Sequence, residues 1–210
     1  MKAPITFGKN SVLIGILLSV VFLCLAGFKY PGGNLKNSNA TGYSWTENYI
    51  SHLLEYKAVN GMDNDARPWG IAGVVLMGIT FGFGFARFAN KIDIKKYSVV
   101  IKFLAYALIL ITALITLPPL HDLMVTLGSV LTLLLFFYVT VCLLKSSLQL
   151  FKFFSVLFLL CYYGAAFMYF TRTGLDYLPA VQKIIHLSQI IFILGLEYYT
   201  AKEDFRLMKN

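Results

Sequence analysis

Charged residues are scarce in this 210-residue chain. Asp, Glu, Lys and Arg together make up 13% of it, against about 25% in ordinary soluble domains. Hydrophobic residues make up 58%, and the mean hydropathy is +0.71. So few charges cannot cover that much apolar surface in water. The composition therefore excludes a water-soluble globular protein and indicates that a bilayer solvates much of the chain.

Cysteine is also sparse, and the positions of the three cysteines argue against extracellular disulfides. Cys24, Cys142 and Cys161 lie inside apolar segments, where they are expected to be small buried hydrophobic residues rather than partners in extracellular disulfides. Basic residues outnumber acidic ones, for a net charge of +8. The bases stand between apolar runs and form no patch, which argues against nucleic acid as a partner and is typical of a membrane protein.

What the sequence has in abundance is long apolar runs. A helix needs about 20 apolar residues to cross the hydrocarbon core, and lipid leaves no partner for an unpaired backbone group. We therefore expect an all-α, polytopic, six-transmembrane-helix bundle that forms a single membrane domain over residues 1–210, with an outer interfacial helix. The predicted spans are Ser11–Phe28, Trp69–Phe88, Ser98–Leu117, Leu123–Leu144, Phe153–Phe170 and Ala180–Thr200.

The distribution of lysine and arginine predicts the orientation. If the N-terminus is cytoplasmic, 12 of the 18 basic residues fall on the cytoplasmic side, as the positive-inside rule requires. We therefore expect both termini in the cytoplasm and, for a bacterial source, the plasma (inner) membrane. The first run follows Lys2 and Lys9 as a signal peptide would, but it is long and lacks a clear cleavage site, so we expect an uncleaved span. The 12 basic residues on the predicted cytoplasmic side are Lys2, Lys9, Arg87, Lys91, Lys95, Lys96, Lys102, Lys145, Lys152, Lys202, Arg206 and Lys209.

The segment Lys29–Pro68 is the one long connection. Its first part, Pro31–Gly42, is rich in Gly, Asn and Ser, which predicts a flexible loop. Its second part, Ser44–Tyr56, predicts an amphipathic helix, because Ser44 and Glu47 fit a capping box. The aromatic residues of that segment recur at helical spacing, as on a helix that lies in the membrane interface. They are Trp45, Tyr49, His52 and Tyr56.

The second span is rich in glycine. Gly78 and Gly82 form a G-x-x-x-G pattern, which lets two helices approach closely. Tight packing is the reading that this pattern favours.

Histidine carries the main functional signal, because all three histidines fall toward the predicted outer side. They are His52, His121 and His186. Ionisable groups inside spans usually face the bundle interior or a wet cavity. Two polar stripes on the fourth and sixth spans could line one outward-open cavity. They are Asp122, Thr126 and Ser129, and Gln182, His186 and Gln189, with Glu197 continuing the second.

Three readings of these residues stay open. Three histidines and a carboxylate could hold zinc, with Asp122 or Glu55 as general base or orienting group, although no H-E-x-x-H or cysteine pair is present. Each histidine could instead be structural, as a helix anchor, an interfacial ring or a hydrogen-bonded buried group. Ser51 could also be a nucleophile. Its neighbour His52 does not face it, because adjacent residues on a helix point about 100° apart, so His121 or His186 would be the base.

Residues 48–55, Asn-Tyr-Ile-Ser-His-Leu-Leu-Glu, with the glycine-rich span that follows, resemble the "YIS-D/H-L-G" region of a family of six-span proteins. The family includes the DRAM/Sfk-type proteins, the GPI-anchor remodelling proteins and a bacterial domain of unknown function. His121 and residues 181–184 also match, whereas the family often has an acidic residue where His52 stands. The resemblance implies a six-helix fold and, in some relatives, lipid or GPI-type remodelling.

A more distant similarity is to the membrane hydrolases that include the alkaline ceramidases, which place a Ser, an Asp and three His around zinc. Ser51, Asp122 and the three histidines have the matching types, without the His-x-x-x-His of that group. We expect a metal-assisted lipid hydrolase or acyl transferase with membrane lipid as its partner. A lipid-binding or partner-binding scaffold is the alternative, and a small proton-coupled transporter that uses His186 and Glu197 is a third.

Overall fold

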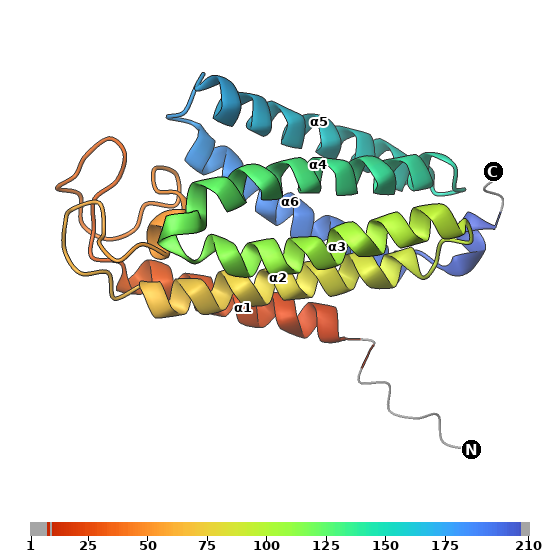
Figure 1. Cartoon of the computed structure of the whole chain (residues 1–210), viewed down its shortest axis with the longest axis horizontal. Helices are drawn as coiled ribbons and strands as arrows, with labels where there is room; N and C mark the ends of the chain where they lie inside the picture. The colour runs from red at the N-terminus through yellow and green to blue at the C-terminus, as the bar shows by residue number, and fades with distance from the viewer. Residues whose placement is uncertain (1–7, 9, 207–210) are drawn as a thin grey trace, which may run out of the picture.

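The computed structural model describes Gly8 and residues 10–206, and over these residues it is an all-α bundle (Figure 1). Six helices are long and apolar enough to cross a membrane, which confirms the predicted six-span integral membrane protein. They are α1 (Ser11–Lys29), α2 (Arg67–Ala89), α3 (Lys95–Ile115), α4 (His121–Leu144), α5 (Gln149–Thr171) and α6 (Leu178–Tyr199). Short 3-10 helices are η1 (Ile50–Leu53), η2 (Pro118–Leu120) and η3 (Lys202–Phe205).

The helices extend beyond the predicted apolar runs where the flanking turns are polar. α3 begins at Lys95 rather than Ser98, and α5 at Gln149 rather than Phe153. Hydropathy ends a run at the first charged residue, but the backbone ladder continues through the headgroup region, which adds several ångströms to each side of the hydrocarbon core.

Successive helices pack as antiparallel neighbours, and α6 closes the bundle against α1 and α2 (Figure 1). α2 packs between α1 and α3 and also contacts α6 and η1, while α5 lies at the edge beside α4 and α6. We call the end formed by residues 30–66, 116–120 and 172–177 the loop end. The termini end, formed by residues 90–94, 145–148 and 200–206, lies at the other end of the bundle.

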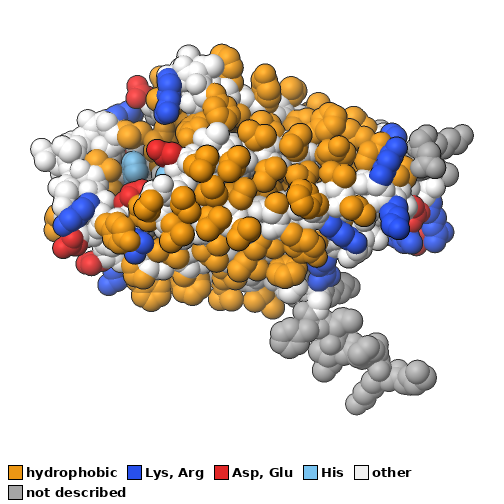
Figure 2. All heavy atoms as spheres, viewed as in Figure 1, with side chains coloured by type: hydrophobic (Ala, Val, Ile, Leu, Met, Phe, Trp, Pro, Cys, Tyr) orange, Lys and Arg blue, Asp and Glu red, His pale blue; other side chains and the backbone are white. Residues whose placement is uncertain are grey.

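An apolar belt surrounds the middle of the bundle. Figure 2 shows hydrophobic side chains over most of the visible face, with charged side chains gathered toward the two ends. Phe103, Leu110, Leu160 and Ile191 are each more than 60% exposed. Contiguous apolar surface on this scale marks a membrane-facing surface rather than a water-facing one, so these side chains contact acyl chains.

Glycines on α2 let its neighbours approach closely. A Cβ added at Gly82 would lie 2.3 Å from Ile109 Cγ1 and 2.9 Å from the carbonyl oxygen of Ala105. A Cβ added at Gly78 would lie 2.5 Å from Thr112 Cγ2. Both glycines therefore face α3, and the predicted G-x-x-x-G contact is present between α2 and α3.

The predicted amphipathic helix over Ser44–Tyr56 is wrong. The segment folds as turns around the four-residue 3-10 helix η1. The expected capping box is absent among the described contacts, because Ser44 offers its backbone N–H to Asn48 Oδ1 at 2.9 Å. Short polar side chains that bond the backbone locally compete with helix formation. The aromatic residues consequently share no helical face: Tyr49 donates to the carbonyl oxygen of Leu175 at 3.4 Å, while Tyr56 lies under the guanidinium of Arg67.

Two buried asparagines hold the loop in place. Asn48 is fully buried, and its Nδ2 donates to the carbonyl oxygen of Gly33 at 2.7 Å and to His52 Nδ1 at 3.0 Å. Asn64 Nδ2 donates to the carbonyl oxygens of His52 and Glu55, both at 2.9 Å. The Pro31–Gly42 segment, which the sequence predicted to be a flexible loop, is tied to the rest of the loop through the Gly33 carbonyl. The loop is thus a folded cap on the bundle.

Candidate functional site

A cavity of about 610 Å³ lies in the half of the bundle nearest the loop end. Every one of the six helices and η1 contribute to its lining. Its walls are mostly apolar, with side chains such as Met77, Leu108, Val125 and Leu135. Apolar pockets of about 300–1,000 Å³ with a few convergent polar groups are typical of small-ligand sites.

The opening of the cavity is on the side of α1 and α6. The lining side chains that are also exposed are Val20 and Cys24 of α1, Trp45 of the loop and Leu187 of α6. Trp45 packs on α1, since a Cβ added at Gly27 would lie 3.1 Å from its ring. Because these positions on α1 and α6 lie within the spans, the cavity opens toward the membrane beneath Trp45.

The histidine and lysine side chains of the lining lie toward the loop end of the cavity, and further polar side chains, such as Ser129 and Gln189, lie deeper in it. The cavity-lining residues that the sequence had singled out are Ser51, His121, Gln182, His186, Gln189 and Ser129, and Lys183 joins them. The polar stripe predicted on α6 therefore does face inward. The other predicted site residues, which are His52, Glu55, Asp122 and Thr126, do not line this cavity.

His186 is the least satisfied polar group of the site. Its Nδ1 is buried, and no hydrogen-bond partner for it exists among the described residues. A buried polar atom without a partner costs about 1–3 kcal/mol, so such atoms are rare in native structures. The His186 ring lines the cavity, but Nδ1 itself is not accessible from it, so this atom is buried against protein.

Gln182 and Lys183 join the loop to α6. Ile50 donates its backbone N–H to Gln182 Oε1 at 3.0 Å. Lys183 Nζ donates to the carbonyl oxygen of Asn48 and lies 5.5 Å from the centre of the Tyr43 ring. These contacts place η1, which carries Ser51, over the loop end of the cavity.

His121 opens α4, and its tautomer is fixed. Its Nδ1 lies 2.9 Å from the carbonyl oxygen of Ile115, which can only accept, so Nδ1 carries the proton in the neutral ring. The other ring nitrogen, Nε2, is then a free acceptor or base for a ligand in the cavity.

His52 has a different environment from the other two histidines. Its Nδ1 accepts from Asn48 Nδ2, which requires the neutral ring. Burial lowers the pKa of His52 to about 4, and the positive charges of Lys183 and His121 act in the same direction. His52 is therefore neutral at physiological pH and acts within the loop rather than in the cavity.

The predicted three-histidine zinc site does not assemble among the described residues. Within residues 8 and 10–206, no three His, Cys, Asp or Glu side chains lie close enough together to hold a metal ion. Asp122, the expected general base, is exposed, and Glu55 is half-buried in the loop. Zinc binding itself stays a prediction.

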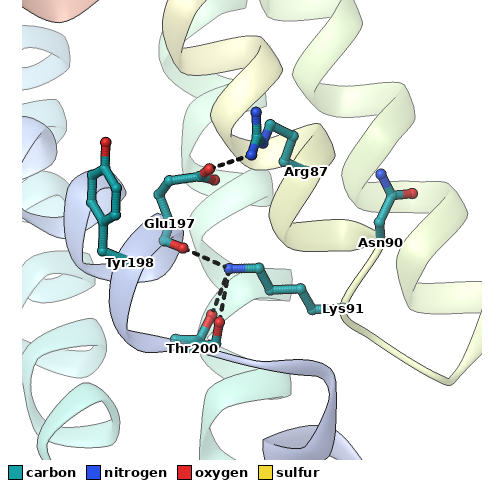
Figure 3. Close-up of a pocket in the computed structure, with 6 residues that line it drawn as sticks. All are labelled: Arg87, Asn90, Lys91, Glu197, Tyr198 and Thr200. Carbon is teal, nitrogen blue, oxygen red and sulfur yellow. Dashed lines mark hydrogen bonds and ion pairs between the residues drawn. The ribbon is translucent and has the colours of Figure 1, made fainter. Parts of the chain in front are cut away.

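A second pocket, of about 360 Å³, lies at the termini end (Figure 3). Arg87 Nη2 pairs with Glu197 Oε1 at 2.6 Å, and Lys91 Nζ donates to the carbonyl oxygens of Leu196, Glu197 and Thr200 at 2.7–3.0 Å. An ammonium group at a helix C-terminus satisfies the carbonyls that the last turn leaves unpaired. Burial lowers the pKa of Lys91, and the Glu197 carboxylate opposes this shift.

This second pocket is best explained as a structural lock. The Glu197 side chain is only 5% exposed and is held in an ion pair with Arg87. His186 and Glu197 are separated by 11 residues of one helix, which is about 16 Å. The predicted proton relay between them has no chain of contacts in the described residues, and transport stays a prediction.

The signal that the sequence interpretation missed is carried by Asn48, Asn64 and Lys183. Lys183 is adjacent to the stripe predicted on α6 but is not a member of it. The two asparagines stand in a polar segment, where nothing in the pattern distinguishes a buried amide from an exposed one.

No family model, no curated protein and no solved structure matches this chain. The likeness of residues 48–55 to the six-span family therefore stays a resemblance.

Proposed function

We propose that this integral membrane protein binds a membrane lipid in the cavity beside α1 and α6, with the lipid headgroup at the loop end. In this proposal the loop end faces the outside and both termini are cytoplasmic. The excess of Lys and Arg on the side of the termini supports that orientation.

The observation that carries the proposal is a mostly apolar cavity whose lining includes the polar side chains of Ser51, His121 and Lys183 toward the loop end. A water-soluble metabolite would leave the apolar walls of α2, α3 and α4 without partners. A purely apolar ligand would leave these polar side chains without partners. An amphiphile, with one polar end and one apolar end, matches both parts of the lining.

The opening also supports a lipid. Val20, Cys24 and Leu187 are exposed on the membrane-spanning parts of α1 and α6, and they line the cavity. A lipid in the bilayer reaches such an opening by lateral diffusion without entering water, which avoids the cost of about 0.8 kcal/mol for each exposed methylene.

The test is to fill the cavity and measure retained lipid. Leu108 of α3 lines the cavity, whereas Leu110, two residues further along, is 62% exposed on the belt and does not. Leu108→Trp should abolish the lipid that co-purifies in native mass spectrometry, and Leu110→Trp should retain it. Size-exclusion profiles and melting temperatures check that both variants fold. Equal lipid content in the folded variants, or a wild type without lipid, would refute the proposal.

Two native cysteines give an independent readout. Cys24 lines the cavity, while Cys161 is exposed on α5 away from it. A bound lipid should slow alkylation of Cys24 by N-ethylmaleimide and leave the rate at Cys161 unchanged. Equal protection of both thiols, or of neither, would contradict binding in this cavity.

Lipid hydrolysis or acyl transfer is a second candidate, which Ser51 and His121 favour because they line the same cavity. Ser51 Oγ would attack an ester carbonyl while His121 Nε2 takes the hydroxyl proton. The bond to the alcohol would break, the alcohol would receive that proton, and water or an acceptor alcohol would then release the acyl group in the same way. Release of fatty acid that Ser51→Ala abolishes would support it, and equal turnover by both proteins would exclude this nucleophile.

The zinc prediction is tested on the same preparations. Metal content is measured by mass spectrometry for the wild type beside His186→Ala. About one zinc per chain that the variant loses would support metal-assisted chemistry, as a metal-bound water supplies a nucleophile near neutral pH. No zinc in either would leave the metal-free route through Ser51.

A further inference from the structure

Three side chains of the cavity lining can carry a positive charge, and no Asp or Glu appears among the described residues of the lining. They are His121, Lys183 and His186. Asp122 follows His121 in sequence but is exposed, outside the lining. In a low-dielectric enclosure an unbalanced ammonium group is costly, so an anion in the cavity would be stabilised by it.

The polar end of the cavity also has more free hydrogen-bond donors than acceptors. The Gln182 carbonyl oxygen is already used by the N–H of Ile50, which leaves the two amide hydrogens of Gln182. Lys183 uses one donor on Asn48 and retains two. Ser51 adds a hydroxyl that has no hydrogen-bond partner among the described contacts. A headgroup made of acceptor oxygens, such as a carboxylate or a phosphate, matches this set.

The size of the cavity limits the apolar part of the ligand. Along α4 the lining extends from His121 to Leu135, which is 14 residues and about 21 Å at 1.5 Å per residue. An extended chain covers about 1.2 Å per bond, so about 17 bonds fit this length. A cavity of this length and about 610 Å³ therefore accommodates an alkyl chain.

We infer that the ligand is an amphiphile with an anionic headgroup, held by Lys183 with Gln182 and Ser51 at the loop end and by the walls of α2, α3 and α4 along its apolar part. This inference rests on the proposed lipid binding and specifies its ligand. A fatty-acid carboxylate and the phosphate of a lysophospholipid share the required chemistry.

The experiment measures binding to the full chain in nanodiscs of zwitterionic two-chain phosphatidylcholine, with partition into empty nanodiscs subtracted. The probes are palmitate, lysophosphatidylglycerol, monopalmitoylglycerol and two-chain phosphatidylglycerol. Both anionic single-chain probes should bind at least tenfold more tightly than the neutral one, because a hydrogen bond to a charged group contributes more than a neutral one. If only one of the two binds, that result identifies the source of the headgroup.

Lys183→Gln keeps a donor and removes the charge, so it should lower affinity for the anionic probes about tenfold and leave the neutral probe unchanged. Lys183→Arg should keep the preference. Lys29→Gln is the matched control, since Lys29 is an exposed lysine at the loop end outside the lining. Melting temperatures confirm that each variant folds.

The outcomes separate this inference from the proposed function. If the probes bind without regard to charge, lipid binding stands and the inference is overturned. An unchanged anionic preference in Lys183→Gln also overturns it. If none of the probes binds above empty nanodiscs and Cys24 stays unprotected, the proposed function itself fails.

Discussion

Removing the Asn48 side chain should loosen the loop end without unfolding the bundle. Asn48 Oδ1 accepts from the Ser44 N–H at 2.9 Å, and Nδ2 donates to Gly33 at 2.7 Å and to His52 at 3.0 Å. Asn48→Ala deletes all three bonds. At a net contribution of about 1 kcal/mol each, the cap should lose about 3 kcal/mol. The loss is larger if water does not reach the vacated Gly33 carbonyl.

Amide hydrogen exchange of residues 30–66, measured by mass spectrometry in nanodiscs, reports this change. A loss of about 3 kcal/mol should speed exchange through local opening by about two orders of magnitude. Amides of α2–α5 should exchange as in the wild type, because their hydrogen bonds lie in the membrane. The cavity should also become more open, so Cys24 should be alkylated faster.

Asn39→Ala provides the control for this experiment. Asn39 is exposed, and its side chain makes no hydrogen bond among the described contacts. Its removal should leave loop exchange unchanged. Equal exchange in Asn48→Ala and Asn39→Ala would show that the buried asparagine does not hold the cap, and the account of the loop end would be wrong.

Three further predictions concern pH, the termini end and helix packing. The pKa of His52, about 4 when folded, lies below its ordinary value of about 6.5, so its stabilisation is present above pH 6.5 and is lost as the pH falls toward 4. At pH 4.5 the free energy of unfolding should be lower by up to about 3 kcal/mol, with a lower melting temperature, and this loss should largely disappear in His52→Gln. Lys91→Met should leave the last carbonyls of α6 unpaired, which should reduce the free energy of unfolding by about 1–3 kcal/mol and lower the melting temperature. Lys95 is exposed, so Lys95→Met should leave the melting temperature unchanged. Gly82→Ala should destabilise by about 1–3 kcal/mol through overpacking, while Gly164→Ala, whose new Cβ meets nothing within 4 Å, should be neutral or slightly stabilising in the same thermal assay.

The candidate site was predictable on α6 but only in part on α4. On α6 the stripe of Gln182, His186 and Gln189 has the phase of the cavity face, because polar side chains in a span turn away from lipid. On α4 the face that lines the cavity contains Val125, Gly128 and Ser129. Of the stripe predicted on α4, Ser129 therefore lines the cavity, whereas Asp122 and Thr126 do not, since Thr126 is about 100° round the helix from Val125. Near a helix end, polar side chains can reach the lipid headgroups, so the helix face on which they lie does not show which face points into the bundle.

The sequence by itself determined the six spans, their limits to within a few residues, and the G-x-x-x-G contact of α2. The reason is that lipid offers no hydrogen bonds, so an apolar run of sufficient length has to be a helix whatever its neighbours are. The tertiary structure alone decided the rest. Which helix faces meet to leave a cavity, and whether a polar segment becomes a helix or a cap fixed by Asn48 and Asn64, depend on side chains that are distant in sequence. Short polar residues allow either local outcome, and only their burial against α6 and α2 selects one.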